Sequence, residues 1–277
     1  MTLAACTIAR DEERDIGGFL ANVTAFCDEV VIVLDAGTTD RTAEVIAEAE
    51  VPDRVTVRVV DRALEPVGGF AAQRNAAGEA ATSDWLLHMD VDMRAPAELV
   101  EEIRSRIGAE GADGYFFRLR NHFLHRPMRG RSWKTWNKTW LARRGRHRFE
   151  RALHENVVFT VPEPSLHQLE APMWHLNDES YDERVHKSIR YSTMRADALI
   201  EAGTQVRPRD LFVKPTTRAL RRYFVEGGFR DGTPGLVYAL HCFNATFRAY
   251  ALAWDRQNRI PRETVENPLD TEPARVA

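Results

Sequence analysis

The stretch Leu86-Leu87-His88-Met89-Asp90-Val91-Asp92 is an apolar run that ends in two carboxylates one residue apart. A short apolar run that is bounded by polar residues predicts a buried strand. Alternate positions of an extended chain point to the same side, so we expect Asp90 and Asp92 to reach one place beyond the strand. Two carboxylates there can hold a hard divalent cation that also contacts a diphosphate. A surface turn before the helix that Pro96 introduces is the structural alternative.

Short apolar runs and helical patterns alternate through the first part of the chain. Four such pairs predict an α/β fold with a mostly parallel sheet flanked by helices. We expect strands at Leu3 to Ala9, Val30 to Leu34, Val55 to Val60 and Trp85 to Met89, and helices at Glu13 to Phe26, Thr42 to Ala49, Phe70 to Ala81 and Ala97 to Ile107. Ligands of such sheets bind beyond the carboxyl ends of the strands, so the residues that follow each strand matter most.

The residues that follow these strands are acidic. The first strand leads into Asp11 and Glu12, and the second ends in Asp35, with Asp40 a few residues later. Carboxylates crowded on one sheet edge repel each other unless a cation or a donor-rich ligand sits among them. Asp35 precedes a turn at Gly37 and can accept hydrogen bonds from a nucleobase or ribose. For Asp40, a helix cap and a ligand contact both remain open.

Three further side chains are candidates for the same site. Arg74 can hold a phosphate or pair with the acidic edge, or be a solvent-exposed helix arginine. Glu155 is a candidate general base that would deprotonate an acceptor hydroxyl. The imidazole of His175 can complete the shell of a cation or touch a diphosphate, although a single histidine often has a structural role. The basic run from Arg143 to Arg148, with Arg151, can clamp phosphate or form a solvated face.

The second half of the chain has a different pattern. Alternating aromatic pieces from Gly114 to about Val161 predict an antiparallel extension of the sheet. After Pro172 the pattern is helical, and the residues from Pro261 onward are polar and expected to fray. The three expected helices run from Tyr181 to Glu201, from Pro208 to Val225 and from Pro234 to Asn258.

Composition and charge exclude some classes of protein. A formal net charge of −3 gives no global attraction to nucleic acid, so no nucleic-acid partner is expected. The three cysteines are too few for a disulfide framework and fit a reducing compartment. The first residues lack a secretory pattern, and no apolar window approaches the roughly 20 residues of a membrane span. We therefore expect a cytoplasmic protein with at most peripheral membrane contact.

The last expected helix carries an apolar stripe with arginines just upstream. Such a stripe is more often core than membrane anchor, but a lipid-linked acceptor would make it useful at the inner face of the plasma membrane. Both interpretations remain open. The stripe consists of Leu236, Leu240, Phe243, Phe247 and Trp254, and the arginines are Arg218, Arg221 and Arg222.

Several motifs occur in a characteristic order. They are Thr7 to Glu13, Asp35 to Asp40, Gln73-Arg74-Asn75, Trp85, Asp90-Val91-Asp92, His154-Glu155, Trp174-His175 and Arg230-Asp231-Gly232. Together they resemble glycosyltransferase family 2, and more narrowly its bacterial branch of lipopolysaccharide-core and cell-envelope glycosyltransferases. The resemblance covers nearly the whole chain.

The resemblance implies a GT-A fold with a C-terminal helical extension. It also implies a nucleoside diphosphate-sugar donor, Mg²⁺ or Mn²⁺, and inversion at the anomeric carbon by one direct displacement. The acceptor would be a saccharide, a lipid-linked molecule or a small molecule. The expected organisation is a catalytic domain at 1–172 with a nucleotide-binding half at 1–110 and an acceptor-side half at 111–172, a helical region at 173–260 and a disordered tail at 261–277.

By the same resemblance, individual residues acquire roles. Asp35 would contact the nucleotide, Asp90 the ribose or the metal, and Asp92 the metal, while Glu155 would be the base. Asp11 stands in the nucleotide-recognition loop where many relatives have Asn. Two alternatives remain: a nucleotidyltransferase, although its Gly-rich phosphate loop with lysine is poorly matched, and a non-catalytic nucleotide-sugar-binding module.

Overall fold

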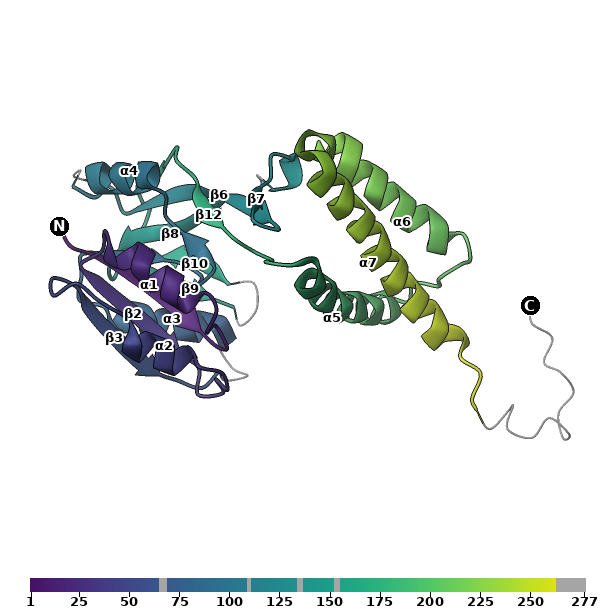
Figure 1. Ribbon diagram of the computed structural model, residues 1–277, viewed down its shortest axis with the longest axis horizontal. Coiled ribbons are helices and arrows are strands. Elements are labelled where there is room, and N and C mark those ends of the chain that lie inside the picture. Colours follow the sequence, from purple (N-terminus) through teal and green to yellow (C-terminus); the bar gives the residue numbers. More distant parts are fainter. Residues whose placement is uncertain (65–68, 109–110, 134–136, 152–154, 263–277) are drawn as a thin grey trace, which may run out of the picture. The chain divides into compact units, whose positions relative to one another are not determined.

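The computed structural model describes two compact units of the chain (Figure 1). The sheet unit comprises residues 1–128 and 133–177, and the helical unit comprises residues 129–132 and those from 178 onward. The described residues are 1–64, 69–108, 111–133, 137–151 and 155–262. The helical unit thus includes a short piece of chain that interrupts the sheet unit in sequence.

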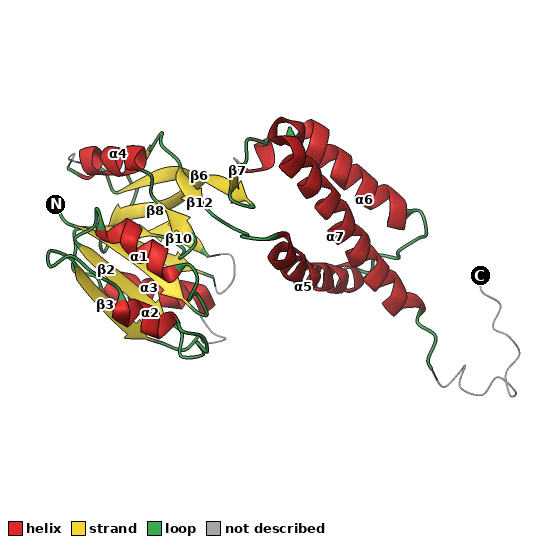
Figure 2. Cartoon of the chain, viewed as in Figure 1, coloured by secondary structure: helices red, strands yellow, loops and turns green. Residues whose placement is uncertain are grey.

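The first part of the sheet unit alternates strands and helices, as Figure 2 shows. In order, the elements are β1 (Leu3–Ala9), α1 (Ile16–Thr24), β2 (Glu29–Leu34), α2 (Thr42–Glu48), β3 (Thr56–Asp61), α3 (Gly69–Ala80), β4 (Trp85–His88), β5 (Met93–Arg94) and α4 (Ala97–Ile107). Each expected strand and helix of this region is present, with bounds that differ by no more than a few residues.

The chain continues with further strands. They are β6 (Gly114–Phe123), β7 (Arg126–Pro127), β8 (Asn137–Arg143), β9 (His147–Glu150), β10 (Asn156–Phe159), β11 (Leu166–Gln168) and β12 (Met173–His175), with a 3-10 turn η1 (Arg131–Trp133) before β8.

The sheet has a parallel half and a mixed half. Its strand order is β3-β2-β1-β4-β8-β6-β12-β5. Strands β3, β2, β1 and β4 run parallel to one another, whereas β8 is antiparallel to both β4 and β6. The prediction of a mostly parallel sheet with an antiparallel extension is therefore confirmed. Strands β9 and β10 form a separate antiparallel pair.

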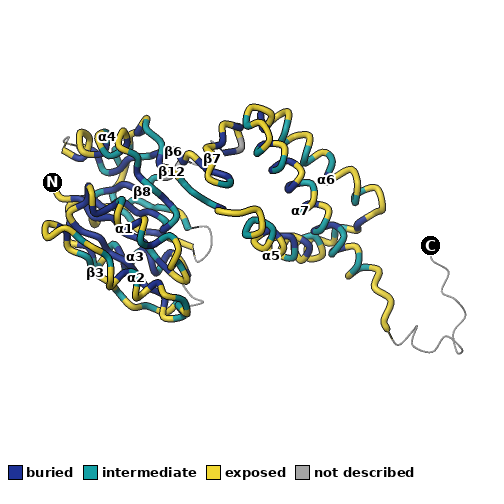
Figure 3. Tube along the Cα trace, viewed as in Figure 1, coloured by how far each residue is buried: buried dark blue, intermediate teal, exposed yellow. Residues whose placement is uncertain are grey.

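Helices cover the sheet and bury its inner strands β1, β2 and β4, whereas the edge strand β3 is largely exposed; Figure 3 draws buried residues in dark blue. Every residue of β2 is buried, as expected for a strand covered on both faces. Helix α4 shows how a helix contributes, because Leu99, Ile103 and Ile107 repeat at four-residue spacing and are all buried. Burying one such side chain is worth about 1.5–3 kcal/mol. The parallel half is thus fixed by apolar packing rather than by its polar edge.

The residues Met173–His175 correct the sequence analysis. They were expected to begin the helical region, but they form β12, which pairs in parallel with β6 and antiparallel with β5. Met173 is fully buried in the core, and that packing holds the segment in the sheet. Three residues are too few to reveal a period in the sequence. The first helix after the sheet unit starts only at Tyr181.

The helical unit consists of three long helices and two short turns. They are α5 (Tyr181–Glu201), α6 (Asp210–Leu220), a π-helical turn η2 (Arg221–Val225), a 3-10 turn η3 (Gly228–Asp231) and α7 (Gly232–Asn258). Helix α5 begins where Ser180 Oγ accepts a hydrogen bond from the N–H of Glu183 at 3.2 Å, a normal N-cap. The three predicted helices are present, and the second one ends in the π-helical turn.

A short loop of the chain is anchored inside the helical unit. Asp231 accepts hydrogen bonds from the backbone N–H groups of Arg129 at 2.6 Å and Gly130 at 3.1 Å. The N–H of Arg131 donates to the carbonyl of Glu226 at 2.6 Å. These three bonds explain why residues 129–132 belong to this unit.

The apolar stripe of α7 is not core. Four of its five members, Leu236, Leu240, Phe247 and Trp254, are exposed. The helix instead buries a face of small and polar-tipped side chains. That face includes Gly235, Tyr238, Ala239, Cys242, Thr246, Ala249, Tyr250 and Ala253. Small residues allow close helix packing, which apolar periodicity alone does not reveal.

Membrane spanning can be judged for the described residues alone. Among them, no helix combines the length and the apolar character that crossing a bilayer requires. The predicted disordered tail lies outside the described residues from position 263 onward.

Candidate functional site

The carboxyl ends of the parallel strands bring the acidic residues to one edge of the sheet. Strands β2, β1 and β4 are neighbours and parallel, so the residues that follow them emerge at the same edge. Asp35 follows β2, Asp11 follows β1 by one residue, and Asp90 follows β4 by one residue. The topology therefore confirms that these three carboxylates share an edge.

Asp35 is buried and already holds two donors of the chain. Its Oδ1 accepts from the N–H of Gly37 at 2.7 Å, and its Oδ2 accepts from Gln73 Nε2 at 3.0 Å. A Cβ at position 37 would lie 2.9 Å from Asp35 Oδ1, so this turn requires glycine. A carboxylate has about four acceptor positions, which leaves capacity for a ligand. The proposed nucleotide contact of Asp35 stays a prediction.

The loops after β1 and β2 are tied together by reciprocal hydrogen bonds. Asp11 accepts from the N–H of Thr39 at 2.7 Å, and this bond is the main reason that its pKa is lowered. Asp40 accepts from the N–H groups of Thr42 at 3.0 Å and Glu13 at 3.0 Å. Asp40 therefore has a local role: it lies one residue before Arg41, the N-cap of α2, and joins the start of that helix to the first loop. Asp11 adopts a left-handed backbone, with φ of 53°.

The Asp-x-Asp segment does not have the expected geometry. Strand β4 ends at His88, and the N–H of Met93 donates to the carbonyl of Asp90 at 2.9 Å, which closes a turn. The side chains of Asp90 and Asp92 consequently contact different partners. The assumption of an extended chain was wrong because this turn begins directly after the strand.

Arg74 joins Asp90 to the candidate base Glu155. Its Nη2 donates to Asp90 Oδ1 at 2.5 Å, and its Nε donates to Glu155 Oε1 at 2.8 Å. The guanidinium also lies 4.4 Å from the ring centre of Trp140. Arg74 is only 4% exposed. Pairing with the acidic edge is therefore confirmed, and the solvent-exposed alternative is wrong.

The charge of Arg74 is stabilised by these partners. Burial alone lowers the pKa of a guanidinium, but the carboxylates of Asp90 and Glu155 outweigh that effect and raise it. We call Arg74, Asp90, Glu155 and Trp140 the Arg74 cluster. His154, the other half of the expected His-Glu pair, lies outside the described residues.

Three consecutive residues of α3 position three parts of the site. Gln73 binds Asp35, Arg74 binds the Arg74 cluster, and Asn75 binds the backbone of Phe149 in both directions at 2.8 and 2.9 Å. Side chains at adjacent helix positions point about 100° apart, so one helix end reaches all three. The Gln-Arg-Asn motif is thus a structural organiser of the site.

Asp92 and His175 form the second contact of the site. Asp92 Oδ2 lies 3.1 Å from His175 Nε2, because β12 places His175 beside Met93 of β5. His175 Nδ1 lies 2.8 Å from Asn121 Oδ1. The Nδ2 of Asn121 donates to the carbonyl of Trp133 at 2.6 Å, which fixes Oδ1 as an acceptor.

This arrangement fits a cation. Since Asn121 Oδ1 can only accept, His175 Nδ1 must donate, and a neutral imidazole then directs its Nε2 lone pair toward Asp92. Two electron-rich atoms that face one another at 3.1 Å suit a shared cation, or a proton on the imidazole. Asp90, the third predicted ligand, is bound by Arg74. Within the described ranges, no set of three or more His, Cys, Asp or Glu side chains is placed to hold a metal.

The basic run contacts its own chain. Arg143 Nε donates to the carbonyl of Ala112 at 2.6 Å, and Arg144 Nε donates to the carbonyl of Ser83 at 3.0 Å. Arg148 pairs with Glu150 at 2.6 Å. These contacts favour a structural role for the run over a phosphate clamp.

A histidine pair, of which His88 is buried, was not predicted from the sequence. His88 and His147 approach to 3.0 Å between their Nε2 atoms, and both pack against Phe149. Burial, followed by the neighbouring His147 and Arg74, lowers the pKa of His88 well below its ordinary value. His88 was visible at the end of the apolar run, but its partner lies 59 residues away. No local pattern could have joined the two.

The sequence of the chain is similar to those of known proteins. Residues 5–167 match the family model described as glycosyl transferase family 2. The chain is 27% identical over 273 residues to a lipopolysaccharide core biosynthesis glycosyltransferase, LpsC, of Rhizobium meliloti, with 97% of this chain and 98% of that protein covered.

Two solved structures resemble the chain at low sequence identity. One is the mannosyltransferase PcManGT from Pyrobaculum calidifontis in complex with GDP-Man and Mn²⁺, with 14% identity, a TM-score of 0.49, and 92% and 88% of the two chains covered. The other is S. aureus TarS 1–349 in complex with UDP, with 13% identity, a TM-score of 0.48, and 93% and 91% covered.

Proposed function

The chain belongs to glycosyltransferase family 2, and from that premise we propose that it transfers a sugar from a nucleoside diphosphate-sugar to an acceptor hydroxyl with inversion. The observation that carries this proposal is the Arg74 cluster, in which one buried arginine holds both Asp90 and Glu155. The cluster places Asp90 and Glu155 on one buried cation, so both carboxylates lie at a single site.

Glu155 acts as the general base. Arg74 fixes its Oε1, which leaves Oε2 to take the proton of the acceptor hydroxyl. The acceptor oxygen then bonds to the anomeric carbon while the bond from that carbon to the diphosphate oxygen breaks. Glu155 is half-buried, so it can still meet a substrate. Arg74 is a positioning residue in this scheme, because it acts through Glu155.

Asp92 and His175 would hold Mg²⁺ or Mn²⁺. When bound, the metal neutralises the charge that develops on the leaving diphosphate. Oxygen and imidazole nitrogen are both ligands for Mn²⁺, and diphosphate oxygens and water would complete the shell. Asn121 holds the imidazole in the tautomer that this role needs.

The remaining carboxylates of the sheet edge would bind the donor nucleotide. Asp35 retains acceptor capacity for a nucleobase or ribose, and Asp90 lies at the same edge for the ribose. Asp11 organises the first loop through Thr39. PcManGT and TarS are described with GDP-Man and UDP, respectively, which suggests the donor classes to try first.

The acceptor would belong to envelope glycan synthesis. This proposal rests on the similarity to the lipopolysaccharide core enzyme over nearly the full length of both chains. Work on a lipid-linked glycan would place the protein in the cytoplasm, peripheral to the inner face of the plasma membrane. The exposed apolar side chains of α7 suit such a location.

A matched pair of glutamate variants tests the function. Glu155→Gln should lower kcat by about 10²- to 10⁴-fold, the usual contribution of a general base. The thermal stabilisation by nucleoside diphosphate and Mn²⁺ should persist, because the donor site is intact. Glu150→Gln, an exposed glutamate nearby in sequence, should retain activity.

Two results would contradict the proposal. A turnover rate of Glu155→Gln within a few-fold of the wild-type rate would show that Glu155 is not the general base. Release of pyrophosphate from a nucleoside triphosphate, with no transfer from any nucleotide-sugar, would favour a nucleotidyltransferase instead.

A further inference from the structure

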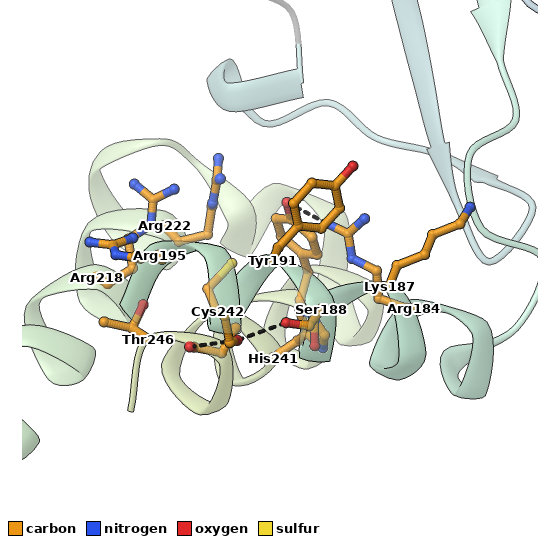
Figure 4. Close-up of a pocket in the computed structure, with 13 residues that line it drawn as sticks. Arg184, Lys187, Ser188, Tyr191, Arg195, Arg218, Arg222, His241, Cys242 and Thr246 are labelled. Atoms are coloured by element: carbon orange, nitrogen blue, oxygen red, sulfur yellow. Dashed lines mark hydrogen bonds between the residues drawn. The ribbon is translucent and has the colours of Figure 1, made fainter. Parts of the chain in front are cut away.

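The helical unit contains a pocket of its own among α5, α6, η2 and α7 (Figure 4). Its volume is about 220 Å³. Pockets for drug-sized ligands hold roughly 300–1,000 Å³, so the occupant would be small. All residues that line this pocket belong to the helical unit, whereas Asp35, Asp92 and Glu155 belong to the sheet unit. The pocket therefore shares no residue with the site assigned to sugar transfer.

Cationic side chains dominate the lining. We call the site the basic pocket and define it by Arg184, Lys187, Arg195, Arg218 and Arg222. In Figure 4 the guanidinium groups of Arg195, Arg218 and Arg222 gather on one side of the pocket.

The pocket has more positive charge than its surroundings balance. Three carboxylates contact three of the five cations: Asp178 pairs with Arg184 and Lys187, Glu183 pairs with Lys187, and Glu226 pairs with Arg222. In the part of the chain that the structure describes, no carboxylate lies within 4.0 Å of Arg195 or Arg218. Two arginines therefore have no counter-charge among the described residues.

The arginines are also held in place around one tyrosine. The guanidinium carbons of Arg184 and Arg222 lie 5.3 and 5.1 Å from the ring centre of Tyr238. The Nη2 of Arg184 donates to the hydroxyl of Tyr238 at 3.2 Å. Side chains fixed in this way lose little freedom when a ligand binds, which favours binding.

Two donors at this site are buried without a hydrogen-bond partner. They are the Nε atoms of Arg184 and Arg222, judged against the residues that the structure describes. A buried donor of this kind costs free energy and is uncommon in folded proteins. A ligand with several acceptor oxygens would satisfy it after a small adjustment of the side chain.

We propose that the basic pocket binds a phosphate group. Arginine forks match phosphate oxygens, and a phosphate offers three terminal oxygens and up to two negative charges to the surplus cations. The small volume suits a phosphate with at most a short polar group attached. Tyr191 lies at the pocket and is 59% exposed, so it can cover the group that carries the phosphate.

His241 agrees with this assignment. It lines the pocket, and burial, followed by the charges of Arg184 and Arg248, lowers its pKa to about 4. The imidazole is therefore neutral at physiological pH and adds no charge of its own. Burial disfavours any charge, so only the second cause, the positive charge of Arg184 and Arg248, also favours an anion in the pocket.

The phosphate could belong to a soluble molecule or to a lipid headgroup. Exposed apolar side chains on the same helices would reach a bilayer whose headgroup entered the pocket. They include Tyr191 and Met194 on α5, Leu220 and Phe224 on α6 and η2, and Leu236 and Leu240 on α7. The shared chemistry is the phosphate group, and the source is settled by experiment.

The first arm of the test measures binding of inorganic phosphate to the full chain by titration calorimetry, with EDTA present. The double variant Arg195→Gln with Arg218→Gln should weaken binding by about tenfold or more, because it removes two charge-assisted contacts. Neither arginine pairs with a carboxylate of the described residues that its loss would leave unpaired, so the double variant should fold. The control, Arg190→Gln with Arg209→Gln, removes the same charge from exposed positions outside the pocket and should bind as the wild type does.

The second arm uses vesicles of phosphatidylcholine with and without phosphatidic acid. Binding to phosphatidic acid that is lost in the pocket variant and kept in the control identifies a lipid headgroup as the source. Binding of inorganic phosphate without such vesicle binding identifies a soluble phosphate. If neither probe binds, or if both double variants weaken binding equally, the basic pocket is not a phosphate site. The effect of Glu155→Gln on sugar transfer does not depend on any of these outcomes, so the two proposals can fail separately.

Discussion

The Arg74 cluster and the basic pocket use the same residue type in opposite ways. Arg74 is buried between two carboxylates of its own chain, at 2.5 and 2.8 Å. Arg195 and Arg218 line a pocket, and in the described residues no carboxylate approaches them within 4.0 Å. The charge of Arg74 is neutralised by carboxylates of its own chain, whereas the charges of Arg195 and Arg218 can be neutralised by an external anion.

This difference separates positioning from binding. An arginine whose carboxylates are supplied by the chain fixes those carboxylates, and its removal damages the fold. An arginine without such partners contributes little to the fold, and its removal should be seen only when a ligand is present. The predictions below test that separation.

The largest effect is expected at Arg74. Arg74→Ala should lower the free energy of unfolding by about 3–5 kcal/mol, because Asp90 and Glu155 would lose their shared buried partner. Urea denaturation of the full chain measures the change. A loss below about 1 kcal/mol would show that the cluster does not depend on Arg74.

The next effect concerns Asp178, the carboxylate that pairs with two cations of the basic pocket. It is 1% exposed and contacts Arg184 at 3.0 Å and Lys187 at 3.4 Å. Asp178→Asn should destabilise the protein by about 1–3 kcal/mol and yet tighten phosphate binding, because it frees Arg184 and leaves Lys187 with Glu183 as its one remaining carboxylate among the described residues. Calorimetry and urea denaturation measure the two changes, with exposed Asp182→Asn as the control. Weaker phosphate binding in Asp178→Asn would contradict the prediction.

A smaller effect is expected in the pH dependence of stability. Because the pKa of His241 is lowered to about 4 in the folded chain, the unfolded chain binds more protons as pH falls below about 6.5. The stability that this neutral imidazole contributes is therefore complete above pH 6.5 and is lost toward pH 4, by up to about 1.4 kcal/mol per pH unit.

Bound phosphate should reduce this loss of stability at low pH. An anion in the basic pocket favours the imidazolium, so the pKa of His241 should rise by up to about 1 unit, while that of His88 should not move. NMR titration of the imidazole signals, with and without phosphate, checks both. An equal rise at His88 would mean that phosphate acts on the protein generally.

The smallest effect is expected at Arg195. Arg195→Gln should change the free energy of unfolding by less than about 0.5 kcal/mol in the absence of phosphate. Denaturation beside Arg74→Ala gives the direct comparison. A loss comparable to that of Arg74→Ala would erase the distinction between the two clusters.

Much of the fold was predictable because several of its strands and helices have clear local sequence patterns. The fully buried β2 reads as an uninterrupted apolar run, and α4 shows a four-residue apolar repeat. The GT-A fold class expected from the ordered motifs is confirmed by family membership and by the mixed α/β sheet with flanking helices. The strand β12 was not predicted, because its place in the sheet depends on pairing with β5 and β6 and not on its own three residues.

The site was only partly predictable, for a related reason. Its residue types were visible, but their pairing depends on long-range contacts, such as the 81 residues between Arg74 and Glu155. The turn at Asp90 also separated two carboxylates that an extended chain would have kept together. The basic pocket was not predicted: Arg218 and Arg222 were visible as basic residues before the last helix, but their partners on α5 lie too far along the chain to be joined with them by a local motif.

The anchored loop at residues 129–132 has a consequence for dissecting the protein. The chain passes from one unit to the other three times, after residues 128, 132 and 177. A fragment that stops at residue 177 would lack Glu226 and Asp231, the acceptors for the N–H groups of Arg129, Gly130 and Arg131. A single cut therefore cannot yield two complete folding modules, and gene fusion or recombination at that point would inherit a loop without its acceptors.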